Sequence, residues 1–292
     1  MVDLHIHSTA SDGSLTPAEL VFEGKKLGLE AMALTDHDTV GGIETFLLTA
    51  ESENLTAIPA VEIGVDFLPD SLHILGYYIN HWNEQLVKGL EEIRKSRKER
   101  APRMIDNLRR YGFDITLSEI LAETSDDSTV GRFHFARAMV RKGFVKDPKE
   151  AFDKYLSAGT PGYYPRKKIL PCEAIELILT AGGLPVIAHP KFVDTDTPAK
   201  FEKLLRDLIE CGLKGVEAYY PKHTKEEEKR YIFLASKYNL LVTGGSDYHG
   251  PDCRNYKLGY GTELEPIPHT IMDGIEQWKK ASLKKNQHQP EL

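Results

Sequence analysis

The sequence predicts an α/β protein in which seven strands form a barrel and a helical segment is inserted between two of them. Short β-rich runs alternate with helix-like segments, which favours parallel strands with covering helices, in a barrel or a doubly wound sheet. The number of runs favours the barrel. The alternation stops over one long charged stretch, which marks the insertion. The predicted strands cover residues 2–7, 31–36, 56–65, 72–79, 184–189, 215–220 and 240–245.

Clear start signals mark the helices that connect these strands. In "SLTPAEL", Thr16 is the predicted N-cap, Pro17 takes the first helical position and Glu19 lies in the first turn. In "TKEEEKRY", Thr224 precedes three acidic residues. Such caps and acidic first turns support helices between the strands.

The insertion is predicted from a change of pattern. From about residue 81 to 165 the sequence is helical and charged, and it ends in the turn-rich segment "SAGTPGYYP". We place a small helical insertion domain at residues 98–165. It divides the barrel into a first part, residues 1–97, and a second part, residues 166–292.

Charge and composition limit the classes of partner. The chain of 292 residues has a formal net charge of −7, which does not favour nonspecific binding of long nucleic acid or of an anionic membrane. A run of about 18 apolar residues and a signal-like start are both lacking, which predicts a cytoplasmic protein. The widely spaced Cys172, Cys211 and Cys253 form no C-x-x-C pair, so we expect reduced thiols.

The first predicted strand carries two histidines on one face. His5 and His7, in "DLHIHSTASDG", lie two residues apart, so both side chains point to the same side of the strand. Two converging imidazoles suit a shared metal ion. Asp12 follows beside Gly13, in a turn where a carboxylate can reach over the strand end.

Later strands add nitrogen and oxygen ligands, mostly where they end. Glu62 interrupts the buried run "AIPAVEIG", where an unpaired carboxylate is costly. Because the carboxyl ends of parallel strands meet at one edge of a sheet, we expect these groups in one cavity. The candidate ligands are His5, His7, Asp12, His37, Glu62, His73, His189, Asp247 and His249.

This ligand set indicates the kind of metal. A mixture of imidazoles and carboxylates without thiolates suits Mn, Fe or Zn better than Mg or Ca. We expect two or three divalent ions, with Mn as the first choice, Fe or Zn as alternatives and Glu62 as a bridge. One histidine at a strand end is more often a hydrogen-bonded residue than a ligand, but the agreement among strands favours a metal centre.

The segments "DLHIHSTASDG", "ALTDHDTVGG", "PAVEI", "IAHP" and "GSDYHG" resemble the PHP (polymerase and histidinol phosphatase) family. "GRFHFARAMV" and "AFDKYLSAGTPGYYP" resemble the insertion of its AMP phosphatase and RNase AM (TrpH-like) branch. The resemblance spans nearly the whole chain and implies a distorted (β/α)7 barrel with three metals. The implied sets are His5, His7, Glu62 and Asp247 for the first ion, Glu62, His73 and His189 for the second, and Asp12, His37 and His249 for the third.

The family resemblance also implies chemistry. A metal-bound hydroxide near His5, His7, Glu62 and Asp247 would attack phosphorus in line, since bound cations lower the pKa of water toward about 7. The ions would also neutralise the phosphoryl and leaving oxygens. The sequence offers no basis for naming a separate general acid.

Two pairs of residues are implied as phosphate contacts. Arg132 and His134, in "GRFHF", would reach in from the insertion. Arg97 and Arg100 match a second anion-binding pair of that branch, and a planar guanidinium can bind phosphate through two hydrogen bonds. For this second pair a solvated helix face is the alternative, because "RKSRKERAPR" is charged on all sides.

Two positions depart from better-known members of the family. Lys191, in "IAHPKFV", replaces the usual glycine, and "VEAYYPKHT" replaces a smaller and more polar stretch. Tyr219, Tyr220 or His223 could therefore shape a different substrate pocket, although aromatic strand residues are more often simply packed.

The sequence thus predicts a metal-dependent phosphoesterase that acts on AMP, a nucleoside 3′,5′-bisphosphate or the 5′ end of a short RNA. A histidinol-phosphatase-like enzyme and a noncatalytic PHP metal-binding module are the alternatives. An amidohydrolase also uses H-x-H on a barrel, but the order of ligands here does not suit it. The physiological substrate, the native metal and the oligomeric state stay open.

Overall fold

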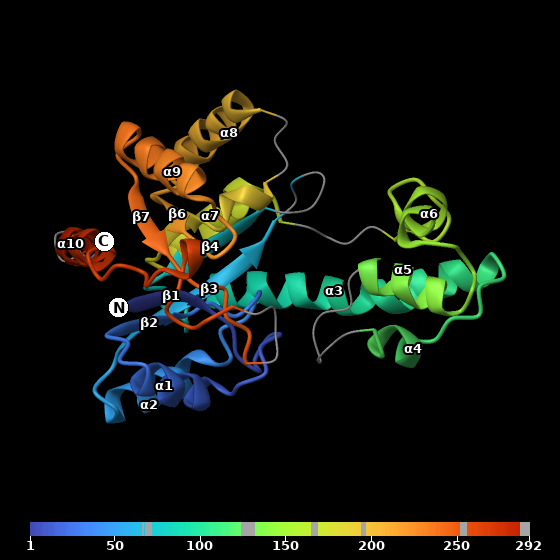
Figure 1. The fold of residues 1–292 in the computed structure, drawn as a ribbon, viewed down its shortest axis with the longest axis horizontal. Helices are drawn as coiled ribbons and strands as arrows, with labels where there is room; N and C mark the ends of the chain where they lie inside the picture. Colours follow the sequence, from blue (N-terminus) through green and yellow to red (C-terminus); the bar gives the residue numbers. More distant parts are fainter. Residues whose placement is uncertain are drawn as a thin grey trace. The chain divides into compact units, whose positions relative to one another are not determined.

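Seven strands form one sheet, and each strand pairs with the next along the chain (Figure 1). The computed structural model describes residues 1–65, 67, 72–123, 132–164, 169–193, 197–251 and 256–286. The strands are β1 (Val2–Ile6), β2 (Ala31–Leu34), β3 (Thr56–Gly64), β4 (His73–Tyr77), β5 (Leu184–Ile187), β6 (Gly215–Tyr219) and β7 (Leu241–Gly244). All seven lie within the predicted runs.

The sheet nearly closes on itself. Ile6, the last residue of β1, forms a parallel bridge with Tyr248, which follows β7. The amide of His7 donates a hydrogen bond to the carbonyl of Tyr248 over 2.9 Å. The first and last strands therefore meet, and the predicted barrel is confirmed.

One strand runs against the others. β4 is antiparallel to both β3 and β5, whereas every other pair in the sheet is parallel. The expectation of parallel strands is wrong at this point, because β4 follows β3 closely and without the crossover helix that a parallel pair needs. The reversal puts His73, at the start of β4, opposite Gly64, at the end of β3. His73 thereby reaches the edge of the sheet where the parallel strands end.

Helices flank the sheet. Those of the barrel are α1 (Pro17–Lys26), α2 (Ile43–Ser52), α7 (Pro171–Thr180), α8 (Pro198–Glu210), α9 (Lys225–Lys237) and α10 (Ile271–Asn286), and α3 (Glu84–Arg110) leads out of it. Thr16 forms the predicted cap: its side chain accepts a hydrogen bond from the amide of Glu19, whose carboxylate accepts one from the amide of Thr16. Thr224 and Glu227 cap α9 in the same way.

Two apolar clusters hold the helices to the strands. One packs Ile271 and Met272 of α10 with residues of β1 to β5. The other packs Leu20 of α1 and Phe46 of α2 against Met32 of β2. All five side chains are buried, and each such burial stabilises the fold by roughly 1.5–3 kcal/mol. These apolar clusters thus support the strands whose ends carry the polar residues.

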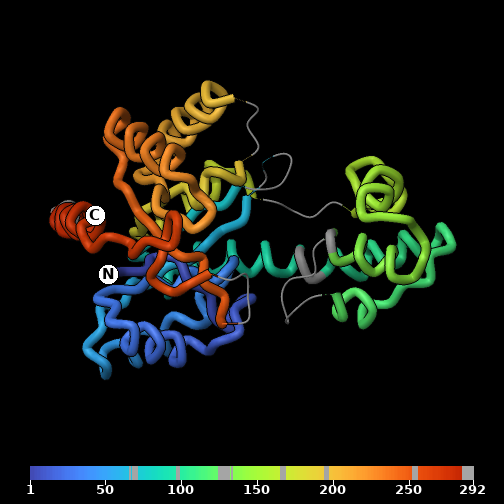
Figure 2. Tube along the Cα trace, viewed as in Figure 1, coloured from blue at the N-terminus to red at the C-terminus, as the bar shows by residue number. Residues whose placement is uncertain are grey.

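The chain divides into two compact units. Residues Met1–Leu90 and Ile169–Leu292 form the barrel unit, and Glu91–Lys168 form the second unit. Figure 2 shows the two chain segments of the barrel unit, blue to cyan and yellow to red. The predicted insertion, 98–165, falls inside the second unit, and α3 crosses its predicted start without a break.

The second unit has its own core. It contains α4 (Leu117–Leu121), α5 (Arg132–Arg141), α6 (Pro148–Ala151) and a π-helical turn over Phe152–Leu156. Leu108, Phe135 and Met139 are among its buried core residues.

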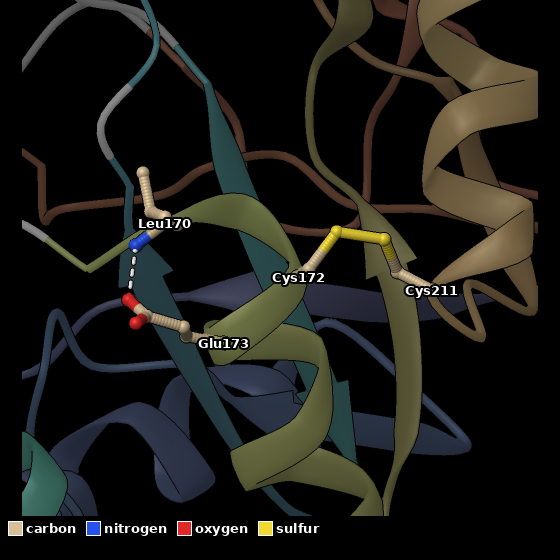
Figure 3. Close-up of a disulfide and its surroundings, with 4 residues drawn as sticks. All are labelled: Leu170, Cys172, Glu173 and Cys211. Carbon is tan, nitrogen blue, oxygen red and sulfur yellow. Dashed lines mark hydrogen bonds between the residues drawn. A yellow bond between two sulfur atoms is a disulfide. The ribbon is translucent and has the colours of Figure 1, made fainter.

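A disulfide joins two helices of the barrel unit. Cys172 in α7 and Cys211 after α8 are bonded, with their Cα atoms 5.2 Å apart (Figure 3). The expectation of reduced thiols is wrong for this pair, because residues 39 positions apart in sequence are neighbours in the fold. Cys253 lies outside the described residues.

Within the part of the chain that the structure describes, no helix combines the length and apolar character needed to cross a bilayer.

Candidate metal centre

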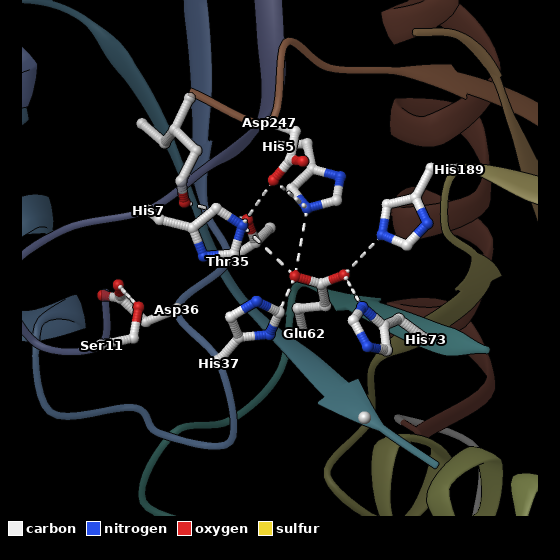
Figure 4. Close-up of polar contacts among 12 residues, drawn as sticks. His5, His7, Ser11, Thr35, Asp36, His37, Glu62, His73, His189 and Asp247 are labelled. Carbon is white, nitrogen blue, oxygen red and sulfur yellow. Dashed lines mark hydrogen bonds and ion pairs between the residues drawn. The ribbon is translucent and has the colours of Figure 1, made fainter. Parts of the chain in front are cut away.

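Five imidazoles surround the carboxylate of Glu62 in β3 (Figure 4). Glu62 is fully buried. The rings come from the ends of β1, β2 and β5 and from the start of β4. Their nearest nitrogens lie 2.7 Å (His73 Nδ1) and 3.0 Å (His189 Nε2) from Oε1, and 3.1 Å (His37 Nδ1), 3.3 Å (His5 Nε2) and 3.3 Å (His7 Nε2) from Oε2.

Two aspartates extend this group. Asp247 Oδ1 lies 3.2 Å from Nε2 of His7 and 3.6 Å from Nε2 of His5. Asp12 Oδ2 lies 3.3 Å from Nε2 of His249 and 3.9 Å from Nε2 of His37. The structure therefore brings all nine predicted ligands together.

The backbone at Gly245, after β7, packs closely against His5 in β1. A Cβ on Gly245 would lie 2.0 Å from the Cβ of His5, so a glycine is needed where the end of β7 passes β1. His5 and His7 point to the same side of β1, as their spacing predicts, and both are fully buried.

The ligand atoms fall into four overlapping groups, each spanning at most 4.8 Å. The groups are His7, Asp12, His37 and His249; His5, His7 and Asp247; His5, Glu62 and His189; and His37, Glu62 and His73. They resemble the three implied ion sets without matching them one for one. His7 lies near Asp12 as well as near Asp247, and His37 near Glu62 as well as near Asp12.

The residues fit divalent cations. Among the described residues, both ring nitrogens of His7, Nδ1 of His37 and Nε2 of His249 are buried and make no hydrogen bond. Buried polar atoms are rarely left in this state. Yet Nε2 of His7 and Nε2 of His249 each face a carboxylate oxygen at about 3.2–3.3 Å. Lone pairs that converge without hydrogen bonds suit atoms that share a cation.

The charged groups of the cluster also favour bound divalent cations. Burial opposes protonation of His7, but the carboxylates of Asp247 and Glu62 outweigh it and raise its pKa to about 10. Burial lowers the pKa of His37 to about 3 despite the charge of Glu62. Burial would raise the pKa of Glu62, yet the surrounding imidazoles hold it well below its ordinary value. Without cations, the carboxylates keep His7 protonated; bound cations would displace that proton.

Sequence reasoning missed Glu217. This fully buried carboxylate in β6 lies 2.9 Å (Oε1) from Nδ1 of His5 and accepts a hydrogen bond of 2.6 Å (Oε2) from the amide of His189. The signal that could have found it is the one that identified Glu62, a carboxylate inside an apolar strand.

Two more buried aspartates support the loops of the centre. Asp36 accepts hydrogen bonds from the amide of Ser8 (2.7 Å) and the hydroxyl of Ser11 (2.6 Å), which fixes the loop before Asp12. Asp3 accepts one of 2.9 Å from the amide of Ser246, next to Asp247.

The departures from the family pattern have different surroundings. Tyr220 is buried and donates a hydrogen bond of 2.9 Å to Oδ2 of Asp247. His223 is also buried, and its Nδ1 lies 2.7 Å from the carbonyl of Ala218. Lys191 forms an ion pair of 2.9 Å with Glu227 of α9. Tyr219 packs against the cluster that includes α10. Of the four residues, Tyr220 contacts a candidate ligand directly.

The predicted phosphate contacts belong to the second unit. The guanidinium carbons of Arg100 and Arg132 lie 5.8 and 6.0 Å from the ring centroid of Tyr163, so both arginines gather at one tyrosine. His134 is partly buried, and burial and then Arg137 lower its pKa. The side chain of Arg97 lies outside the described residues.

Comparison with known proteins identifies the family. The model of the PHP domain matches residues 3–160, more than half of the chain. The chain belongs to the PHP domain family. This PHP protein is 32% identical over 275 residues to the 3′,5′-nucleoside bisphosphate phosphatase of Chromobacterium violaceum, which covers 94% of this chain and 96% of the relative. It is 32% identical over 262 residues to a 5′-3′ exoribonuclease of Haemophilus influenzae, covering 90% of this chain and 94% of the relative.

Solved structures share the PHP fold. A C. violaceum protein described as an amidohydrolase, with bound sulfate and no metal, superposes with a TM-score of 0.75 at 32% identity, covering 94% of this chain and 96% of the other. A Bifidobacterium adolescentis protein assigned as a metal-dependent phosphoesterase superposes with a TM-score of 0.71 at 30% identity, covering 94% of each chain.

Proposed function

We propose that this PHP protein is a metal-dependent phosphoesterase that releases phosphate from nucleotides. Five imidazoles gathered around one buried carboxylate, Glu62, with Asp247 beside His5 and His7, carry the proposal. A carboxylate oxygen offers about two lone pairs, so hydrogen bonds alone cannot satisfy this arrangement, whereas two or three divalent cations can.

Each candidate ligand belongs to at least one of the three ion sets that the family resemblance implies. The first ion would use His5, His7, Glu62 and Asp247, the second Glu62, His73 and His189, and the third Asp12, His37 and His249. Glu62 is the natural bridge, because its two oxygens face different histidines. Mn is our first choice, with Fe or Zn as alternatives, since imidazole and carboxylate ligands suit all three.

The chain's own residues position and shield the reaction. Bound cations supply Lewis acidity, which activates water and draws charge from phosphoryl oxygens. Tyr220 holds Oδ2 of Asp247, and the packed strand ends keep the ligands in place. We assign phosphate binding to Arg132 and His134, and with them Arg97 and Arg100, so that the helical domain at 98–165 would cap the substrate.

The relatives indicate the substrate class. They are named for a nucleoside bisphosphate and for RNA 5′ to 3′ cleavage, and they match this chain over most of their length. We infer AMP, a nucleoside 3′,5′-bisphosphate or a short RNA 5′ end as substrate. The net charge of −7 favours a small nucleotide over long nucleic acid. From such substrates we infer a cytoplasmic enzyme.

Phosphate release tests the proposal. The protein, supplied with Mn²⁺, is incubated separately with AMP, adenosine 3′,5′-bisphosphate, a 5′-phosphorylated RNA dinucleotide and histidinol phosphate. We expect release from at least one nucleotide, and none from it after chelation or in His7→Ala. His269→Ala, a half-exposed histidine near Glu30, is the matched control and should stay active. Release from histidinol phosphate alone would favour the histidinol phosphatase alternative, and no release from any substrate would favour the noncatalytic module.

A further inference from the structure

We propose that Glu217 is a positioning residue that couples two ion sites of the metal centre. One carboxylate oxygen orients the ring of His5, and the other holds the backbone of His189. This inference rests on the proposed metal centre and adds a residue that contacts no cation itself.

The first contact determines which nitrogen of His5 faces the ligands. Oε1 of Glu217 lies 2.9 Å from Nδ1 of His5. An ionised carboxylate can only accept a hydrogen bond, so Nδ1 carries a hydrogen, and the lone pair that a cation needs must come from Nε2. That nitrogen lies 3.3 Å from Oε2 of Glu62 and 3.6 Å from Oδ1 of Asp247. Glu217 therefore presents His5 in the form that binds a cation.

The second contact stabilises an unusual backbone. His189 has φ 26° and ψ 62°, a left-handed conformation that is strained for a side chain with a Cβ. Its amide donates a hydrogen bond of 2.6 Å to Oε2 of Glu217. This conformation brings Nε2 of His189 to 3.0 Å from Oε1 of Glu62. The bond thus maintains a ligand on the other side of the bridging carboxylate.

The position of Glu217 lets one carboxylate act on both ligands. It lies in the middle of β6, which pairs with β5 and β7, and its side chain is fully buried. His5 and His189 approach opposite oxygens of Glu62. Loss of both carboxylate contacts should therefore alter ion binding at two places.

Glutamine and alanine distinguish this role from simple packing. In Glu217→Gln, the amide oxygen can still accept from the amide of His189, but the NH₂ group then faces Nδ1 of His5. That nitrogen must become an acceptor, which places the hydrogen on Nε2 and blocks it. Glu217→Ala removes both contacts.

The test is a binding isotherm for Mn²⁺ on each variant, with bound metal per chain measured after dialysis. We expect Glu217→Gln to weaken one class of site about 10–100-fold, the range for outer partners of metal ligands, and Glu217→Ala to weaken two. The control is Glu228→Gln, a buried carboxylate of α9 beside Lys225, which should match the wild type.

A folded Glu217→Gln protein with the wild-type isotherm would overturn the proposal. Should Glu217→Ala fail to fold, the isosteric Gln variant still decides it. Phosphate release by the wild type is scored separately. Wild-type metal binding that weakens in Glu217→Gln, without release from any substrate, would support this role of Glu217 and refute the phosphoesterase function.

Discussion

The hydroxyl of Tyr220 donates a hydrogen bond of 2.9 Å to Oδ2 of Asp247, while Oδ1 of the same carboxylate faces His7 at 3.2 Å. Tyr220 therefore fixes the orientation of a candidate metal ligand through the carboxylate oxygen that does not face His7. Removal of the hydroxyl would leave that oxygen buried with one partner fewer.

We expect Tyr220→Phe to weaken Mn²⁺ binding about 10-fold and to lower the free energy of unfolding by about 1–3 kcal/mol. Metal titration and urea unfolding measure the two effects. Tyr219→Phe, a partly buried neighbour packed on the apolar cluster, is the control and should bind metal normally. Wild-type metal affinity in Tyr220→Phe would show that Asp247 needs no such support.

The stability of the cation-free protein should depend on pH. The pKa of His7 is raised to about 10, and that of His5 lies well above its ordinary value, compared with about 6.5 in an unfolded chain. Raised pKa values of bases contribute stability that is complete below about pH 6.5 and is lost as the pH rises through the folded-state pKa. The lowered pKa of His37 acts below about pH 6.5, outside this window.

Urea unfolding in the presence of a chelator should therefore show a free energy of unfolding that falls between about pH 6.5 and 10. Cation-free His7→Gln should fall less steeply, because one of the two raised groups is gone. The metal-loaded protein should lack this decline, since cations take the place of the protons. A flat profile in the cation-free wild type would mean that His5 and His7 are neutral there.

Arg132→Ala should raise KM or lower kcat/KM for nucleotide substrates while bound Mn²⁺ stays at the wild-type level. Arg132 lies over the rings of Phe152 and Tyr163 in the second unit. Arg141→Ala, at the end of the same helix and paired with Glu123, serves as the control. Steady-state kinetics that match those of the wild type would remove Arg132 from substrate binding.

Reduction of the disulfide should destabilise the barrel unit by about 2–4 kcal/mol, since Cys172 and Cys211 close a loop across 39 positions. Urea unfolding with and without a phosphine reductant measures the difference. A Cys172→Ser, Cys211→Ser double variant should unfold alike under both conditions and still bind Mn²⁺. Identical unfolding of the oxidised and reduced wild type would refute a stabilising bond.

Sequence patterns predicted the strands and the nine candidate ligands because both depend on local order. His5 and His7 share a face through their spacing, and Glu62 stands out inside an apolar run. The direction of β4 was not predictable in this way, since a short run reads alike in either direction. His73 was found through its residue type, but its place depends on the antiparallel pairing with β3.

Tertiary contacts account for the rest. The role of Glu217 could not be predicted because it depends on contact with His5, which lies 212 residues earlier in the sequence. The bond between Cys172 and Cys211 depends on how α7 and α8 lie beside each other, which spacing does not encode. Arg100 and Arg132 share Tyr163 because the second unit folds its helices together.

The bridge between Ile6 and Tyr248 closes the barrel within one residue of two candidate ligands, His7 and Asp247. Separation of β1 from β7 would move those ligands apart, so we expect opening of this strand pair to release a bound ion. By linkage, an ion that binds only when β1 and β7 are paired would stabilise that pairing. Exchange of the His7 amide hydrogen, which is bonded across this strand pair to Tyr248, would then slow as metal is added. A bound metal ion would thus stabilise the pairing of β1 with the end of β7 that closes the barrel.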